Sequence, residues 1–381
     1  MEKRYIMSPG PTPVPPEILL TMAQPIIHHR GPQFKSILSE VREGLKYVFQ
    51  TKNEVLIFAS SGTGAMEGAV TNTLSPGDKA LVVRGGKFGE RWTEICMAYG
   101  IKVDNIDIEW GRSIDPDQIQ KRLKKDPGIR AVFTQAHETS TGVKYPIMEI
   151  GDIIHKHKNT IIIVDAISAL GAFDIPVDTW HLDIVIGGSQ KALMLPPGLS
   201  FVSVSHKAWK FVERSQLPKY YFDFLKERRA ISKNQGAYTS PVSLIMGLKE
   251  ALNMIKKEGI EAIFNHHKRM SAATKAAVNA MGLKLYSKES PSEALTAIEA
   301  PEGIDGQKIV SIMREKYGIT VAGGQGQAKG KIFRISHMGY INTFDIIATI
   351  SALELTLKEL GYVLELGSGV KAAEEVLYHK Q

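Results

Sequence analysis

The stretch that decides the fold runs from Asp183 to Lys191 and reads Asp-Ile-Val-Ile-Gly-Gly-Ser-Gln-Lys. The apolar run at 183–186 is short and bounded by glycines, which is typical of a buried strand. The two glycines let a bulky ligand approach the backbone closely. A lysine just after such a strand is costly to bury as a cation, so its pKa falls and its neutral amine can attack an aldehyde. The alternative is a surface loop lysine, the commoner fate of a single lysine.

Short apolar runs and helical patterns alternate on both sides of this stretch. Buried strands are predicted at 55–59, 80–83, 131–134, 160–164, 183–186 and 199–204, and helices at 33–50, 64–74, 88–99, 116–124 and 147–157. This alternation predicts an α/β fold, in which a mostly parallel sheet is covered by helices on both faces. Ligands of such sheets bind at the carboxyl ends of the strands, so we expect the chemistry there.

The pattern changes toward the C-terminus and predicts a smaller α+β domain. Two long helices are predicted first, at 242–258 and 260–281, and the change follows Gly282: strands at 296–299 and 331–336, a helix at 306–317 and a last long helix at 344–360. The proline-rich opening, 8–16, is predicted to be extended, because proline fixes φ and lacks a donor. With 381 residues the chain exceeds one compact core. The predicted parts are an N-terminal arm (1–20), a large ligand-binding domain (21–265) and a small C-terminal domain (266–381).

Composition narrows the class of protein. The net charge is +7, but the basic residues are interleaved with acids, which predicts solvated helix faces and no nucleic-acid surface. A basic rim that attracts anionic substrates stays open. The single cysteine, Cys96, excludes a disulfide within the chain and a thiolate metal cluster. No run reaches the roughly 18 apolar residues of a membrane span, and no signal-peptide pattern opens the chain, so we expect no membrane partner and a cytoplasmic location.

A second motif, Ser-Ser-Gly-Thr-Gly-Ala-Met-Glu-Gly at 60–68, follows the strand at 55–59 and opens a helix. Small residues at a helix N-terminus let backbone N–H groups approach an anion, so the motif is a candidate phosphate cradle. The spacing of Gly62, Gly64 and Gly68 also imitates a dinucleotide fingerprint. A tight turn without a ligand is the third interpretation.

A third feature is Asp165, directly after the strand at 160–164. Its carboxylate is predicted at the ligand-facing edge of the sheet, with a helix cap as the alternative. Cradle, acid and lysine thus follow the ends of three strands. Pyridoxal phosphate needs these parts: N–H donors for its phosphate, an anion for its ring nitrogen and an amine for its aldehyde.

Five segments resemble the class V aminotransferases, in particular the alanine–glyoxylate and serine–pyruvate or serine–glyoxylate branch. They are Ser61–Glu67, Glu138–Gly142, Val164–Asp165, Gly188–Leu193 and Pro196–Gly198. The resemblance covers nearly the whole chain. It implies the type I pyridoxal-phosphate-dependent transferase fold, a homodimer with active sites at the subunit interface, and amino-acid and 2-oxo-acid substrates. No metal is expected.

Carried over residue by residue, the resemblance implies roles at the cofactor. Lys191 is the Schiff-base lysine, and Asp165 pairs with the pyridine nitrogen. Thr139 is expected to hydrogen-bond the ring hydroxyl. The residues expected at the phosphate are Gln190, Ser61, Gly62 and Thr63.

Four further residues are matched in the same way. Phe88 stands where an aromatic side chain stacks on the ring, and Ile167 is expected against the opposite face. Thr239 is expected to reach the phosphate of the neighbouring subunit. Arg334 matches the arginine that holds the substrate carboxylate, a natural bidentate task.

The chain also departs from the branch. Gly236 replaces a tyrosine, and Thr63 stands where histidine occurs, so the phosphate cup is expected to close differently. His29 and Arg30, followed by Phe34, are similar to phosphoserine aminotransferases, where such a pair helps to hold the substrate phosphate. The alternative for His29 and Arg30 is dimer packing.

The expected reaction moves an amino group from serine or alanine to glyoxylate or pyruvate, with Lys191 as general base. Phosphoserine is the alternative donor. Cys96 is predicted to be a core residue on a helix, which argues against a cysteine desulfurase. A nicotinamide oxidoreductase would want an acid after the strand at 80–83, where Arg84 stands. A non-catalytic binding role would leave Lys191 without a purpose.

Overall fold

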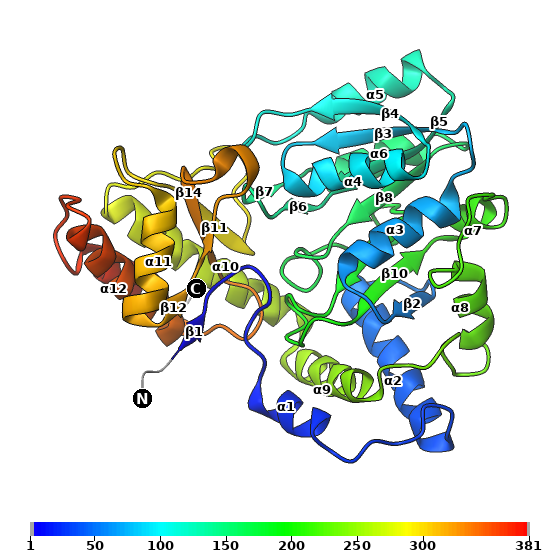
Figure 1. Cartoon of the computed structure of the whole chain (residues 1–381), viewed down its shortest axis with the longest axis horizontal. Coiled ribbons are helices and arrows are strands. Elements are labelled where there is room, and N and C mark those ends of the chain that lie inside the picture. Colours follow the sequence, from blue (N-terminus) through cyan, green and yellow to red (C-terminus); the bar gives the residue numbers. More distant parts are fainter. Residues whose placement is uncertain (1–3, 379–381) are drawn as a thin grey trace.

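The computed structural model describes residues 4–378, which form two lobes (Figure 1). The larger lobe is built on a seven-stranded sheet in the order β2-β10-β9-β8-β5-β3-β4. All neighbours pair in parallel except β10, which is antiparallel to both of its neighbours, so the predicted mostly parallel sheet is confirmed. The strands are β2 (Val55–Phe58), β3 (Lys79–Arg84), β4 (Lys102–Asp107), β5 (Ile129–Gln135), β8 (Ile161–Asp165), β9 (Ile184–Gly188) and β10 (Ser200–Val204).

Helices cover both faces of this sheet, because successive strand residues point to opposite sides. In β3, Leu81 and Val83 face one helical layer, while Ala80 and Val82 face the other. The first layer contains α2 (Pro32–Phe49), α5 (Pro116–Lys125), α6 (Ile147–His155) and α9 (Val242–Glu258). The second contains α3 (Gly62–Thr73), α4 (Lys87–Ala98), α7 (His206–Val212) and α8 (Phe224–Ile231).

The smaller lobe holds a three-stranded antiparallel sheet in the order β11-β14-β13. Its strands are β11 (Leu295–Glu299), β13 (Ala322–Gly323) and β14 (Ile332–Ser336), and its helices are α10 (Ile260–Ala280), α11 (Gly306–Tyr317), α12 (Thr343–Glu359) and α13 (Ser368–Tyr378). The prediction that the helix at 344–360 is the last one is wrong, because α13 follows it and packs against α10. Gly369 and Ala373 of α13 are buried, and Val370, Val376 and Leu377 pack partly buried against the core of the smaller lobe.

The N-terminal segment joins the two lobes. Strand β1 (Tyr5–Ile6) pairs with β12 (Ile319–Thr320) of the smaller lobe. Helix α1 (Pro16–Met22) packs on α9 of the larger lobe. The extended prediction for 8–16 therefore fails at its last residue, because Pro16 opens the helix at a position that needs no backbone donor. Among the described residues, no helix is long and apolar enough to cross a membrane.

Candidate active site

The carboxyl ends of three strands bring the predicted motifs to one edge of the large sheet. Strands β2 and β9 run the same way because β10 is antiparallel to both, and β8 is parallel to β9. Ser61 follows β2 and is the N-cap of α3, so the first turn of that helix opens at this edge. Asp165 ends β8, and Lys191 follows β9 after a short turn. The edge therefore combines free helix N–H groups, a carboxylate and an amine.

Lys191 is enclosed by the N-terminal segment. Its Nζ donates a hydrogen bond to the carbonyl of Pro9, and a Cβ added at Gly10 would lie 2.2 Å from Nζ. Burial lowers the pKa of the Lys191 amine to about 8; Asp165 opposes this shift, and Arg334 adds to it. Roughly a tenth of the amine is therefore neutral, and nucleophilic, at pH 7, and most of it is neutral above pH 8.

Asp165 is a buried carboxylate, 5% exposed. Its Oδ1 accepts a hydrogen bond from Ile167 N at 2.9 Å. Burial raises its pKa to about 6, against the effect of this hydrogen bond and of the positive charges of Arg91 and Lys191. Within residues 4–378 it forms no ion pair. A cationic group placed against it would relieve the cost of burial.

The cradle at the start of α3 is tight. Gly62 is buried, and a Cβ added there would lie 2.2 Å from Cδ1 of Ile167. The hydroxyl of Thr63 accepts a hydrogen bond from Arg91 Nη1 at 3.2 Å. Across the edge, Oε1 of Gln190 is buried and has no hydrogen-bond partner among the described residues. A buried amide oxygen of this kind is available to a donor on a ligand.

Phe88 lies in the first turn of α4 and is held there by Glu138, to which sequence reasoning assigned no role. The fully buried Glu138 carboxylate accepts hydrogen bonds from Phe88 N at 3.2 Å and from Gly89 N at 3.0 Å. It also accepts from the hydroxyl of Ser140 at 2.5 Å. Burial raises the pKa of Glu138, and these three donors oppose the shift together with the N–H of Ser140. The only signal in the sequence was an acid within a run of small polar residues.

Arg91 is the second residue that sequence reasoning missed. It lies one turn after Phe88 in α4, and its guanidinium carbon is 4.9 Å from the centroid of the Phe88 ring. It also donates to Thr63, as described above. The side chain of Arg91 therefore links the aromatic position to the cradle.

Arg334 comes from β14 of the smaller lobe and is 4% exposed. Its Nη1 donates to the carbonyl of Thr139 at 2.8 Å, and its Nη2 donates to the carbonyl of Gly323 at 2.7 Å. Burial lowers its pKa to about 10, while the Glu138 charge acts in the opposite direction. Two backbone carbonyls thus fix the guanidinium and leave it further N–H donors for a carboxylate.

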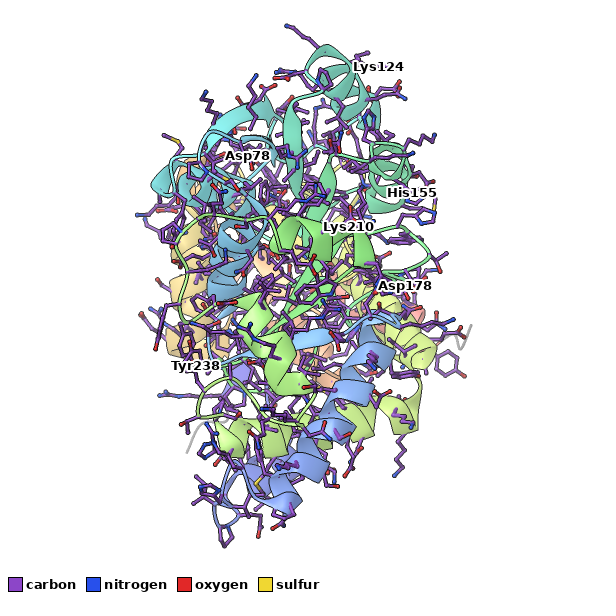
Figure 2. The ribbon with its side chains drawn as sticks, turned by 90° about the vertical axis from the view of Figure 1, so that its right-hand side faces the viewer. Asp78, Lys124, His155, Asp178, Lys210 and Tyr238 are labelled. Carbon is purple, nitrogen blue, oxygen red and sulfur yellow. The ribbon has the colours of Figure 1, made fainter. Side chains whose placement is uncertain are left out.

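Three predicted residues lie apart from this cluster. Thr239 is exposed in the loop between α8 and α9, beside Tyr238, which is labelled in Figure 2. His29 and Arg30 lie between α1 and α2, where Arg30 Nε donates to His29 Nε2 at 3.2 Å.

Cys96 is buried in α4, as predicted, and burial raises its pKa to about 12. A thiol in that state is a poor nucleophile.

The family model for aminotransferase class V matches residues 4–348, so the chain belongs to the class V aminotransferase family. It is 46% identical to "Soluble hydrogenase, small subunit" of Synechococcus sp. (strain PCC 6716), with 99% of each chain covered. It is 40% identical to L-aspartate–glyoxylate aminotransferase of Paracoccus denitrificans (97% of this chain, 95% of that one). It is 35% identical to serine–glyoxylate aminotransferase of Methylorubrum extorquens (98% and 96%).

A solved structure extends the likeness to the fold. The ureidoglycine–glyoxylate aminotransferase of Bacillus subtilis superposes with a TM-score of 0.95 at 30% identity, covering 100% of this chain and 99% of that one. The expected fold class, that of the pyridoxal-phosphate-dependent aminotransferases, is therefore confirmed, and the chain is an aminotransferase.

Proposed function

We propose that this enzyme binds pyridoxal phosphate through Lys191 and transfers the amino group of a small amino acid, serine or alanine, to glyoxylate or pyruvate. The observation that carries the proposal is the pairing of two buried, mutually dependent groups at one sheet edge. These are an amine whose pKa is lowered to about 8 and a carboxylate whose pKa is raised to about 6. Glyoxylate is favoured as acceptor because three of the similar enzymes are named for it.

The residues present fit the cofactor. The Asp165 carboxylate, which is buried and forms no ion pair among the described residues, suits the N–H of a protonated pyridine. The first turn of α3 offers N–H groups to a phosphate, joined by the side chains of Ser61 and Thr63. When bound, the cofactor supplies an electron sink for a carbanion next to the amino group.

The side chains of this chain supply binding, orientation and proton transfer. Arg334 holds the carboxylate of the amino acid and thereby aligns its Cα–H bond. The neutral amine of Lys191 removes the Cα proton and later returns a proton. Phe88 and Ile167 hold the two faces of the ring, and Thr139 hydrogen-bonds its hydroxyl.

We also propose a homodimer in which Thr239 reaches the phosphate of the other subunit. An exposed aromatic group supports this proposal: Tyr220 is 73% exposed, Tyr221 is 40% exposed, and Tyr221 stacks on Tyr238 with ring centroids 5.0 Å apart. Surfaces of this kind are enriched in interfaces. His29 and Arg30 are assigned to the same interface. Light scattering on the purified protein measures its molar mass in solution. A monomeric protein that still binds the cofactor tightly would refute the proposed homodimer.

The domain boundaries and the location stay predictions. They are the arm at 1–20, the large cofactor-binding domain at 21–265, the small domain at 266–381, and the cytoplasm.

The name of the hydrogenase relative suggests a different activity. Iron–sulfur clusters are held by several cysteine thiolates, and this chain has one cysteine. Lys191 and Asp165 suit amino-group transfer, so we propose the activity of the relatives that are named aminotransferases.

The first experiment is the absorption spectrum of the purified protein with pyridoxal phosphate, before and after addition of an amino acid. We expect visible absorbance that shifts to shorter wavelength with serine or alanine and is lost in Lys191→Ala. The donor panel includes aspartate and phosphoserine, and the acceptors are glyoxylate, pyruvate and 2-oxoglutarate. A protein that stays colourless with added cofactor would refute the proposal, and a strong preference for phosphoserine would refute the named donors.

A further inference from the structure

Three buried side chains behind the candidate site form a continuous chain of hydrogen bonds. His137 Nδ1 lies 3.0 Å from the hydroxyl of Ser168, and that hydroxyl lies 2.5 Å from the hydroxyl of Thr139. None of the three residues is more than 4% exposed. They come from different elements: His137 from β6 (His137–Glu138), Thr139 from the turn after it, and Ser168 from the loop after β8. We name this set the His137–Ser168–Thr139 chain.

One end of the chain lies at the site, and the other lies in the core. The backbone carbonyl of Thr139 accepts a hydrogen bond from Arg334, and Ser168 lies in the loop that follows Asp165, the last residue of β8. His137 packs edge-on against Phe173, with ring centroids 6.2 Å apart. The Nε2 atom of His137 is buried and has no hydrogen-bond partner among the described residues.

The surroundings of His137 decide where its single proton lies. Burial is the main cause that lowers its pKa to about 3; a hydrogen bond with Ser168 opposes this shift, the charges of Lys191, Arg334 and Lys144 contribute to it, and the ring is therefore neutral. A buried N–H without an acceptor is more costly than a bare lone pair. The nearby positive charges also favour a lone pair on Nε2 over an N–H dipole. We therefore assign the proton to Nδ1, which donates to Ser168.

This assignment gives the chain a direction. The Ser168 hydroxyl accepts from His137, so its own proton is free for the hydroxyl of Thr139. Thr139 then accepts from Ser168 and keeps its proton for a further acceptor. With the proton on Nε2, the chain would run the other way, and Thr139 would donate to Ser168 and present only lone pairs to the site.

We propose that His137 and Ser168 are positioning residues that orient the hydroxyl of Thr139 as a hydrogen-bond donor toward the ring oxygen of the bound cofactor. The inference rests on the proposed function, because it takes pyridoxal phosphate as the ligand. A hydrogen bond donated to that oxygen competes with the proton shared between the oxygen and the nitrogen that Lys191 contributes. The His137–Ser168–Thr139 chain therefore lowers the pKa at which the bound cofactor changes colour.

The test is a pH titration of the visible absorbance of the cofactor-loaded protein without substrate. We expect Ser168→Ala, His137→Phe and Thr139→Val each to raise the midpoint by about one pH unit, the size of one hydrogen bond to a charged group. The double variant His137→Phe/Ser168→Ala should shift it no further than the single variants, because the chain acts as a unit. Ser271→Ala is the matched control: its buried hydroxyl donates to the carbonyl of Ser292, in the smaller lobe, and its midpoint should equal that of the wild type.

Unchanged midpoints in variants that still hold the cofactor would overturn the inference and leave the proposed function standing. A wild-type protein that never takes up pyridoxal phosphate would overturn the proposed function itself. A second measurement covers variants that fail to fold. Nitrogen-15 spectra of the loaded wild-type protein, with the His137 signal assigned by His137→Gln, should show the proton on Nδ1, and a proton on Nε2 would refute the inference.

Discussion

The guanidinium of Arg334 donates a hydrogen bond to the backbone carbonyl of Thr139, 2.8 Å away, and so joins the smaller lobe to the edge of the large sheet. Thr139 presents its hydroxyl in one direction and its carbonyl in the other. In the proposed function, this one residue couples the position of the substrate carboxylate to that of the cofactor ring. A shift between the lobes would disturb both.

Replacing Arg334 by lysine should weaken substrate binding more than cofactor binding. A lysine carries one compact charge and cannot hold the carbonyls of Thr139 and Gly323 while gripping a carboxylate with two parallel bonds. We expect kcat/KM for the amino donor to fall about 10- to 100-fold, matching roughly 1.5–3 kcal/mol for hydrogen bonds to a charged group. Steady-state kinetics measures this. Arg112→Lys, at an exposed ion pair, is the control and should change little. A loss of cofactor absorbance with an unchanged KM would contradict the assigned role.

Glu138→Gln should loosen the cofactor. The two oxygens of Glu138 divide their partners, Phe88 N and Gly89 N on one and the N–H and hydroxyl of Ser140 on the other, and the amide keeps only one acceptor oxygen and no charge, so the anchor of the first turn of α4 is weakened. We expect the dissociation constant for pyridoxal phosphate to rise about tenfold, measured by fluorescence titration.

The matched control is Glu354→Gln. Glu354 is also buried and accepts backbone hydrogen bonds, from Gly367 N at 2.7 Å and Gly369 N at 2.6 Å, but it lies in α12 of the smaller lobe. Both variants should lose stability, by about 1–3 kcal/mol. Equal losses of cofactor affinity in the two variants would show that Glu138 acts through overall stability alone.

Asp165→Asn should stabilise the cofactor-free protein at alkaline pH while damaging function. Because burial raises the folded pKa of Asp165 from 3.8 to about 6, its protonated form is the one that suits the fold. The stability that this preference contributes is present below about pH 4 and is lost as the pH rises through 6. Asparagine stays neutral, so the variant should exceed the wild type by about 2–3 kcal/mol at pH 8 and match it at pH 4. Urea unfolding of both proteins across this range measures the difference, and parallel pH profiles would count against it.

Capture of pyridoxal phosphate should depend on pH through Lys191. Only the neutral amine attacks an aldehyde, and the pKa of this amine is lowered to about 8. The bimolecular rate should therefore rise nearly tenfold per pH unit between pH 6 and 7.5 and level off above pH 8.5. Stopped-flow absorbance follows the reaction, and Lys191→Arg should show no covalent phase. A flat profile would mean that another step limits capture.

Local patterns predicted much of this molecule because its motifs are short and contiguous. Strand, glycine pair and lysine lie within nine residues at 183–191, and the alternation of strands and helices fixes which sheet edge they share. Strand β4 escaped prediction because it lies at the sheet edge and reads Lys-Val-Asp-Asn-Ile-Asp, which lacks a buried apolar run.

The features of the candidate site that the sequence did not predict depend on contacts between residues far apart in the chain. The grip of Glu138 on α4 joins residues 50 apart in the chain, and Arg334 meets Thr139 across 195 residues. Neither contact has a local periodicity that reveals it. The direction of the His137–Ser168–Thr139 chain depends on burial and on neighbouring charges, which only the folded arrangement defines.

The pairing of β1 with β12 has a consequence for biosynthesis. Tyr5 leaves the ribosome long before its partner Ile319, and the segment between β1 and α1 is the one that closes over Lys191. Domains fold as they emerge, starting from the N-terminus, so this segment must wait without its partner while the large sheet assembles. The β1–β12 pair can therefore form only late in synthesis, whereas the contacts of the same segment with the larger lobe, in which Thr12 donates to the carbonyls of Gln190 and Lys191, involve residues made much earlier.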